Sequence, residues 1–101
     1  MIATLYIPGQ SSETIDELDS PEIVNGFTNV PNQVPALLDC LPDLVDILAS
    51  GRGYVVYSVF DSEGEANDNA MEAVSTLTGI QFSPDDDDTL LRGPVLVVNN
   101  L

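Results

Sequence analysis

Oxygen-bearing side chains recur at regular spacing in one polar stretch, "DSEGEANDNAME" (61–72). Positions 1, 3, 5, 7, 9 and 12 of this stretch are the positions that supply ligands in a calcium-binding EF-hand loop. Here they are occupied by Asp61, Glu63, Glu65, Asn67, Asn69 and Glu72. The stretch departs from that loop because Ala66 replaces the turn glycine, and because a strand is expected before it. A calcium site is one hypothesis; a solvated loop in which Asn67 or Asp68 caps a following helix is the other.

A second set of carboxylates follows a helical spacing. Asp39, Asp43 and Asp46 recur at i, i+4 and i+7 of a stretch expected to be helical, so they would form one row opposite its leucines. Carboxylates at high density can imitate the phosphates of a nucleic acid backbone. The alternative is an ordinary solvated helix face. Further acids predicted to extend this surface are Glu63, Glu65, Asp68, Asp85, Asp86, Asp87 and Asp88.

Residues for common catalytic chemistry are missing. The chain has no histidine and no lysine, so Ser/His, Cys/His and Schiff-base mechanisms lack their partners. Carboxylate pairs are plentiful, but glycosidase chemistry needs two at a defined gap across a cleft. Cys40 lies among leucines and cannot form an internal disulfide, so we expect an inert core thiol. The sequence therefore predicts a binding protein that is not an enzyme and uses no cofactor.

The elements that would position these residues fit one domain, residues 1–101. Apolar runs at 2–7, 53–60 and 94–100 predict strands, and the middle one should be central because both its faces are apolar. Residues 69–79 predict a helix ended by Gly79. Residues 10–32 could hold one short strand or helix, and the sequence leaves their order open.

The stretch 32–51 predicts a second, longer amphipathic helix, capped by Asn32, kinked at Pro42 and ended by Gly51. Its apolar stripe would consist of Leu37, Leu38, Leu41, Leu44, Val45 and Leu48. With this helix included, the expected fold class is α/β or α+β. It would be a small single-layer sheet of about three to four strands, with two helices packed on it.

Charge limits the partners. Seventeen acidic residues against two arginines give a net charge of −15, which repels nucleic acid and anionic membranes. No stretch approaches the ~20 apolar residues of a membrane span, and the first residues lack the basic start of a signal peptide, so a cytoplasmic location is predicted. The predicted partner is a basic nucleic-acid-binding protein, and the oligomeric state stays open, a homodimer included.

Short motifs follow one another in the second half of the chain. A strand leads into an acidic D-x-E-G turn, an Asn-x-Ala helix start follows, and a G-x-V-L-V-V strand closes the chain. The residues that carry them are Asp61, Glu63, Gly64, Asn69, Ala70, Gly93, Val95, Leu96, Val97 and Val98. In these residues the chain resembles small phage- and plasmid-borne domains of unknown function. The resemblance implies a mobile-element origin, with a host cell's cytoplasm as the location, and it transfers no activity.

Two functions from different classes follow. In size and charge the chain is similar to the acidic DNA-mimic inhibitors that phages use against host restriction, CRISPR or DNA-repair enzymes. This similarity and the acidic rows predict an inhibitor that binds and blocks a nucleic-acid-handling host protein. The alternative is a halophile-adapted interaction domain or subunit with no mimicry. It follows because lysine is absent and aspartate outnumbers glutamate by 11 to 6.

Overall fold

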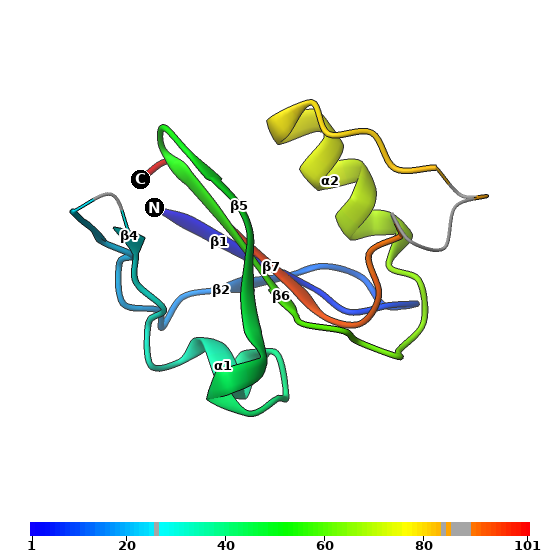
Figure 1. Cartoon of the computed structure of the whole chain (residues 1–101), viewed down its shortest axis with the longest axis horizontal. Helices are drawn as coiled ribbons and strands as arrows, with labels where there is room; N and C mark the ends of the chain where they lie inside the picture. Colours follow the sequence, from blue (N-terminus) through cyan, green and yellow to red (C-terminus); the bar gives the residue numbers. More distant parts are fainter. Residues whose placement is uncertain (26, 84, 86–89) are drawn as a thin grey trace.

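A five-stranded antiparallel sheet forms the centre of the structure. The structure is a computed structural model, and it describes residues 1–25, 27–83, 85 and 90–101. Its strand order is β2-β1-β7-β6-β5 (Figure 1). The strands are β1 (Ile2–Tyr6), β2 (Glu13–Ile15), β5 (Val45–Gly51), β6 (Tyr54–Val59) and β7 (Val95–Asn99). Two further strands, β3 (Ile23–Val24) and β4 (Phe27–Thr28), pair as a small second sheet. The helical segments are α1 (Val34–Leu37), the 3₁₀ turn η1 (Pro42–Leu44) and α2 (Asp68–Thr78).

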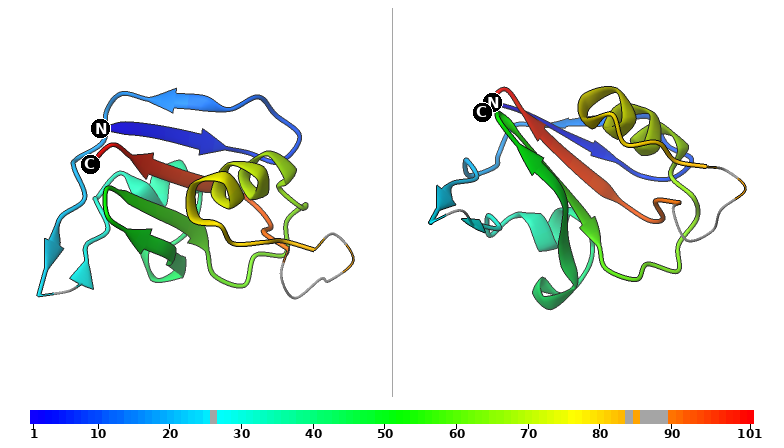
Figure 2. Two further views of the ribbon diagram at one scale, coloured as in Figure 1. Left: turned by 90° about the horizontal axis from the view of Figure 1, so that it is seen from above. Right: turned by 45° about the horizontal axis from the view of Figure 1, so that its top comes forward.

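The inner strands β6 and β7 are covered on both faces. One face packs against α2 through Ala70, Met71 and Val74, and the other packs against α1 through Val34 and Leu38. Figure 2 shows the two helices on opposite sides of the sheet. A strand covered on both faces needs apolar side chains at successive positions. This requirement explains the unbroken buried runs 55–57 and 95–98.

Several predicted elements are confirmed. Strands β1, β6 and β7 lie within the ranges that the apolar runs predict, and β6 is an inner strand. Helix α2 also lies where its pattern predicts. Its N-cap is Asn67, and it ends at Gly79, which adopts the left-handed conformation with φ of 80°.

The predicted fold class, α/β or α+β with two helices packed on three to four strands, is wrong. The described chain has a five-stranded antiparallel sheet and a separate strand pair, and α2 is its one helix longer than four residues. The difference arises in two segments. Residues 10–32 supply three strands instead of one short element, and the predicted helix 32–51 supplies α1, η1 and strand β5.

Backbone constraints explain why the helix 32–51 does not form. Pro42 lacks the N–H that a continuing helix needs. The residue before a proline is driven out of the helical region, and Leu41 is extended, with φ of −68° and ψ of 148°. Asp39 adopts a left-handed conformation with φ of 52°, directly after the last turn of α1. The helical pattern is therefore interrupted twice within four residues.

Pairing with β6 takes over where the helix fails. Val45 lies opposite Val59, and Ile47 lies opposite Tyr57. β-Branched residues suit such a half-buried pleated surface. The predicted leucine stripe is divided as a result. Leu38 is buried under the sheet, whereas Leu41 and Leu44 are exposed.

The two outer strands, β2 and β5, both carry acid. Glu13 lies on β2, whose chain continues into Asp16 and Glu17, and Asp46 lies within β5. Strand β5 also has a register shift between Ile47 and Ala49. Charges and bulges at outer strands hinder the addition of a further strand. Opposite edges of the sheet are therefore both acidic.

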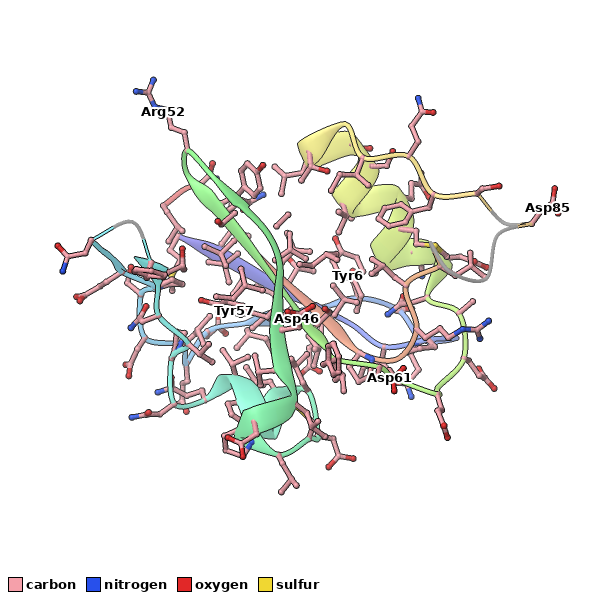
Figure 3. The ribbon with its side chains drawn as sticks, in the orientation of Figure 1. Tyr6, Asp46, Arg52, Tyr57, Asp61 and Asp85 are labelled. Atoms are coloured by element: carbon pink, nitrogen blue, oxygen red, sulfur yellow. The ribbon has the colours of Figure 1, made fainter. Side chains whose placement is uncertain are left out.

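Tyr57 ties a connecting segment to the centre of the sheet (Figure 3). Its side chain is fully buried on β6, and its hydroxyl donates to the carbonyl oxygen of Asn29 at 2.8 Å. Burial disfavours the charged phenolate and raises the pKa of Tyr57 from its ordinary value of 10.0 to about 12.

Tyr57→Phe should lower the free energy of unfolding by about 1–2 kcal/mol at neutral pH, because it leaves the Asn29 carbonyl without this donor. It should also change the response to alkali. The stability that neutral Tyr57 contributes is fully present below pH ~10 and is lost as the pH rises toward ~12. Urea unfolding at several alkaline pH values measures both effects. Tyr54→Phe is the matched control and should lose stability with rising pH as the wild type does. If Tyr57→Phe also loses stability as steeply as the wild type between pH ~10 and ~12, the role assigned to Tyr57 is contradicted.

Candidate functional site

The predicted contact row of Asp39, Asp43 and Asp46 is not a row on a helix. Asp39 follows α1, Asp43 lies in η1 and Asp46 lies on β5, and all three are exposed. Helical spacing therefore does not describe their positions. Burial and, secondarily, the Asp39 carboxylate raise the pKa of the neighbouring Cys40 thiol. A thiol with a raised pKa holds little reactive thiolate at neutral pH.

The other predicted contact residues lie in two places. Glu63 and Glu65 are exposed in the loop between β6 and α2, and Asp68 is the exposed first residue of α2. Asp85 is exposed too, and Figure 3 shows it well away from Asp46. The remaining members of the aspartate run, Asp86, Asp87 and Asp88, lie outside the described residues.

Three aspartates from separate segments lie near one corner of the sheet, where η1 meets the end of the β5–β6 pair. The backbone N–H of Phe60 donates to the carbonyl oxygen of Leu44 at 2.7 Å, which joins η1 to the residue after β6. Asp43 precedes Leu44 and Asp61 follows Phe60, so these two residues flank the hydrogen bond. Asp46 lies two residues after Leu44. Asp46 and Asp61, both labelled in Figure 3, line one groove. We call Asp43, Asp46 and Asp61 the acidic corner.

The groove beside the acidic corner has a volume of about 420 Å³. Apart from the two carboxylates, its lining consists of Leu48, Ser58, Val59, Phe60, Ser62, Phe82, Leu90, Leu91 and Arg92. The hydroxyls have no histidine or lysine to activate them, so the groove lacks the pairing of a nucleophile with its base. The Arg92 guanidinium also donates to the carbonyl oxygen of Gly64 at 3.4 Å. The groove therefore places two carboxylates and one guanidinium beside apolar side chains.

The acidic loop 61–67 is fastened along residues 91–93. Gly93 N–H donates to the Glu65 carbonyl, and Asn67 N–H donates to the Leu91 carbonyl, both at 2.9 Å. Gly64 permits this close approach, because a Cβ there would lie 3.2 Å from the Cα of Gly93. Backbone contacts therefore fix the course of the loop, and its carboxylates project from an anchored segment.

Asn67 joins three elements through its buried side chain. Its Oδ1 accepts from the Ala70 N–H at 3.2 Å and caps α2. Its Nδ2 donates to the carbonyl oxygen of Tyr6 at 3.0 Å and to that of Gly93 at 2.8 Å. The residue is 1% exposed, so none of these bonds is replaced by water without opening the fold. Asn67 therefore links the end of β1, the approach to β7 and the start of α2.

These bonds place the predicted calcium-loop residues differently from a calcium loop. Position 7 of such a loop offers its carbonyl oxygen to the ion, but the Asn67 carbonyl accepts from the Met71 N–H within α2. The helix already begins at Asp68, the eighth position. Among the described residues, no group of three or more His, Cys, Asp or Glu side chains is placed to hold a metal ion. In this structure, the stretch 61–72 forms a capped helix start.

Exposed apolar residues at the same corner were missed by the sequence analysis. Leu41 is 69% exposed, Phe60 63% and Leu44 39%. The two leucines belong to the stripe that was expected to be buried on a helix. Pro42 is the signal that could have found them, since a helix broken there leaves its leucines without the predicted packing face.

Asn67→Ala should lower the free energy of unfolding by about 2–4 kcal/mol, because it removes the helix cap and leaves two buried carbonyls without their donor. Asn67→Asp keeps an acceptor for the cap but removes the donor, so it should be as damaging as the alanine variant. Thermal or urea unfolding measures both. The control is Asn69→Ala, which removes one exposed contact of 3.5 Å and should change stability little. Equal effects at positions 67 and 69 would contradict the role of Asn67.

The helices in the described ranges have three, four and eleven residues, and none is long and apolar enough to cross a membrane. Comparison with known proteins returned no matching family model, no matching curated protein and no matching solved structure.

Proposed function

We propose that this protein binds and blocks a basic protein that handles nucleic acid, by presenting carboxylates in place of phosphates. The observation that carries the proposal is the exposure of every Asp and Glu in the described part of the chain. With a net charge of −15 and no lysine, such a surface has a strong negative potential. A basic groove attracts it by the same electrostatic force that it exerts on a phosphate backbone.

The acidic corner is the proposed centre of contact. Its residues come from η1, from β5 and from the position after Phe60, and the strand pair and the Leu44–Phe60 hydrogen bond join the segments that carry them. The anchored loop continues from it with Glu63, Glu65 and Asp68. A preorganised surface loses less conformational freedom on binding than a flexible acidic tail would. This favours contact at the corner over a diffuse attraction.

The type of partner follows from the same charge. Direct binding of nucleic acid is disfavoured because phosphates and carboxylates repel each other. We propose action in the cytoplasm of a host cell, where restriction, CRISPR and repair enzymes offer basic grooves of the required kind. In this role the protein is an inhibitor and catalyses no reaction.

A second function is favoured by a different observation. Carboxylates also occupy the opposite edge of the sheet, at Glu13, Asp16 and Glu17. Acid dispersed over both edges is what adaptation to a salty cytoplasm would produce. In that case the protein is a small halophilic interaction domain, and the carboxylates serve hydration alone.

Two triple variants separate a contact site from general charge. Asp43→Asn/Asp46→Asn/Asp61→Asn removes the acidic corner, and Glu13→Gln/Asp16→Asn/Glu17→Gln removes equal charge from the opposite edge. Each variant is used to capture proteins from nuclease-treated host lysate, and a captured protein is counted only if added nucleic acid displaces it. The corner variant should retain at least about tenfold less of such a protein than the wild type does, because three rim charges contribute additively at moderate salt. The edge variant should retain nearly the wild-type amount.

The melting temperatures of both variants serve as the folding control, and neither should fall, since each variant relieves repulsion. Equal losses of captured protein in the two variants would show that the net charge, and not the corner, is responsible. Unchanged capture in both would contradict the proposed function altogether.

Salt dependence of folding distinguishes the two functions directly. Under the proposed function, the protein should melt cooperatively in dilute buffer of about 20 mM salt, because its carboxylates already lie in water and are only partly repelled. Circular dichroism melts from dilute buffer to molar potassium chloride measure this. A chain that is unfolded in dilute buffer and folds only in molar salt would favour the halophilic domain.

A further inference from the structure

Three exposed apolar residues at the acidic corner are joined to one another by backbone hydrogen bonds. Leu41 immediately precedes the 3₁₀ turn η1, and Leu44 is the last residue of that turn. The Leu44 N–H donates to the Leu41 carbonyl at 2.9 Å, which fixes this turn. Phe60 lies across from Leu44, since the preceding pair is Val45 with Val59. We call Leu41, Leu44 and Phe60 the apolar patch.

The apolar patch is interleaved with the acidic corner. Asp43 lies between the two leucines in the chain, and Asp61 directly follows Phe60. Phe60, Asp46 and Asp61 line the same groove. An exposed apolar centre with a charged rim is the usual composition of a protein-binding surface. Removal of such large apolar side chains from water by a partner contributes favourably to binding.

We infer that the apolar patch is the anchor by which this protein docks on its partner, and that the partner offers an apolar pocket framed by lysine or arginine. This inference rests on the proposed function and adds a second type of contact to it. Charge complementarity selects the occupant. A second copy of the chain would bring two sets of corner carboxylates together with −15 on each molecule, and an anionic membrane would be repelled in the same way.

The two types of contact should respond differently to salt. Attraction between the carboxylates and a basic rim weakens as salt rises, whereas burial of Phe60 and Leu41 does not. A purely electrostatic mimic would release its partner at high salt. With the anchor, part of the affinity should persist there.

Two synthetic basic peptides test the inference. One is an amphipathic helix of leucine and lysine, and the other has the same length and charge with serine in place of leucine. Fluorescence anisotropy should show that the wild-type protein binds the leucine peptide at least about tenfold more tightly, a difference that persists at high salt. Leu41→Ser/Phe60→Ser should remove the difference while leaving the affinity for the serine peptide unchanged.

Phe27→Ser is the matched control, because Phe27 is 79% exposed on β4 and lies outside the patch. It should behave as the wild type. Phe60→Ser alone, which changes one exposed residue, covers the case in which the double variant misfolds, and it should remove most of the difference.

Other outcomes would overturn the inference in recognisable ways. Equal affinity for both peptides would leave the acidic function standing and remove the anchor. Binding of neither peptide would contradict the acidic function as well. An equal loss in Phe27→Ser would show a nonspecific apolar effect. A dimer in sedimentation experiments that dissociates in Phe60→Ser would assign the patch to a second copy.

Discussion

The chain must fold while keeping its carboxylates in water, because it has two arginines to set against seventeen acids. Burying an unpaired carboxylate would cost several kcal/mol. In the described residues every acid is exposed, and the core is built from apolar side chains on both faces of the sheet. The described acids consequently lie on outer strands, in turns and loops, and at exposed positions of α2. This constraint produces the surface on which the proposed function depends.

Within that constraint, Asn67 determines where the acidic loop lies. Its five side-chain and backbone partners come from β1, from the approach to β7 and from α2. At the other end of the loop, the Phe60–Leu44 hydrogen bond fixes the exit from β6. Repulsion between neighbouring carboxylates would otherwise spread the loop apart. A neutral buried amide holds one end and a backbone bond holds the other, and the Arg92 guanidinium adds a hydrogen bond to the Gly64 carbonyl between them.

The sequence was informative where one pattern had one physical meaning. Runs that are apolar on both faces predicted β6 and β7, and Asn67 with Gly79 marked the two ends of α2. The stretch 32–51 carried two meanings, because its leucines repeat with a helical period while Pro42 and the β-branched residues after it favour a strand. Pairing with β6 decided between them. The apolar patch was missed because the wrong helix assigned its leucines to the core, although Pro42 argued against that helix.

Loss of the helical row changes the form of the proposed mimicry but not its basis. A straight row of carboxylates would imitate one nucleic acid strand, whereas the proposed corner would present grouped carboxylates and add apolar contacts that nucleic acid does not make. Such a surface would be more specific, because a basic groove that lacks an apolar pocket could contact the carboxylates but not the apolar patch.

Chemical-shift mapping of the ¹⁵N-labelled protein, titrated with the leucine–lysine peptide, tests this account most directly. The account predicts that the perturbed amides are confined to residues 39–46 and 58–65. Perturbations of equal size along residues 13–17, at the opposite acidic edge, would contradict it and show that the charge acts without a defined site.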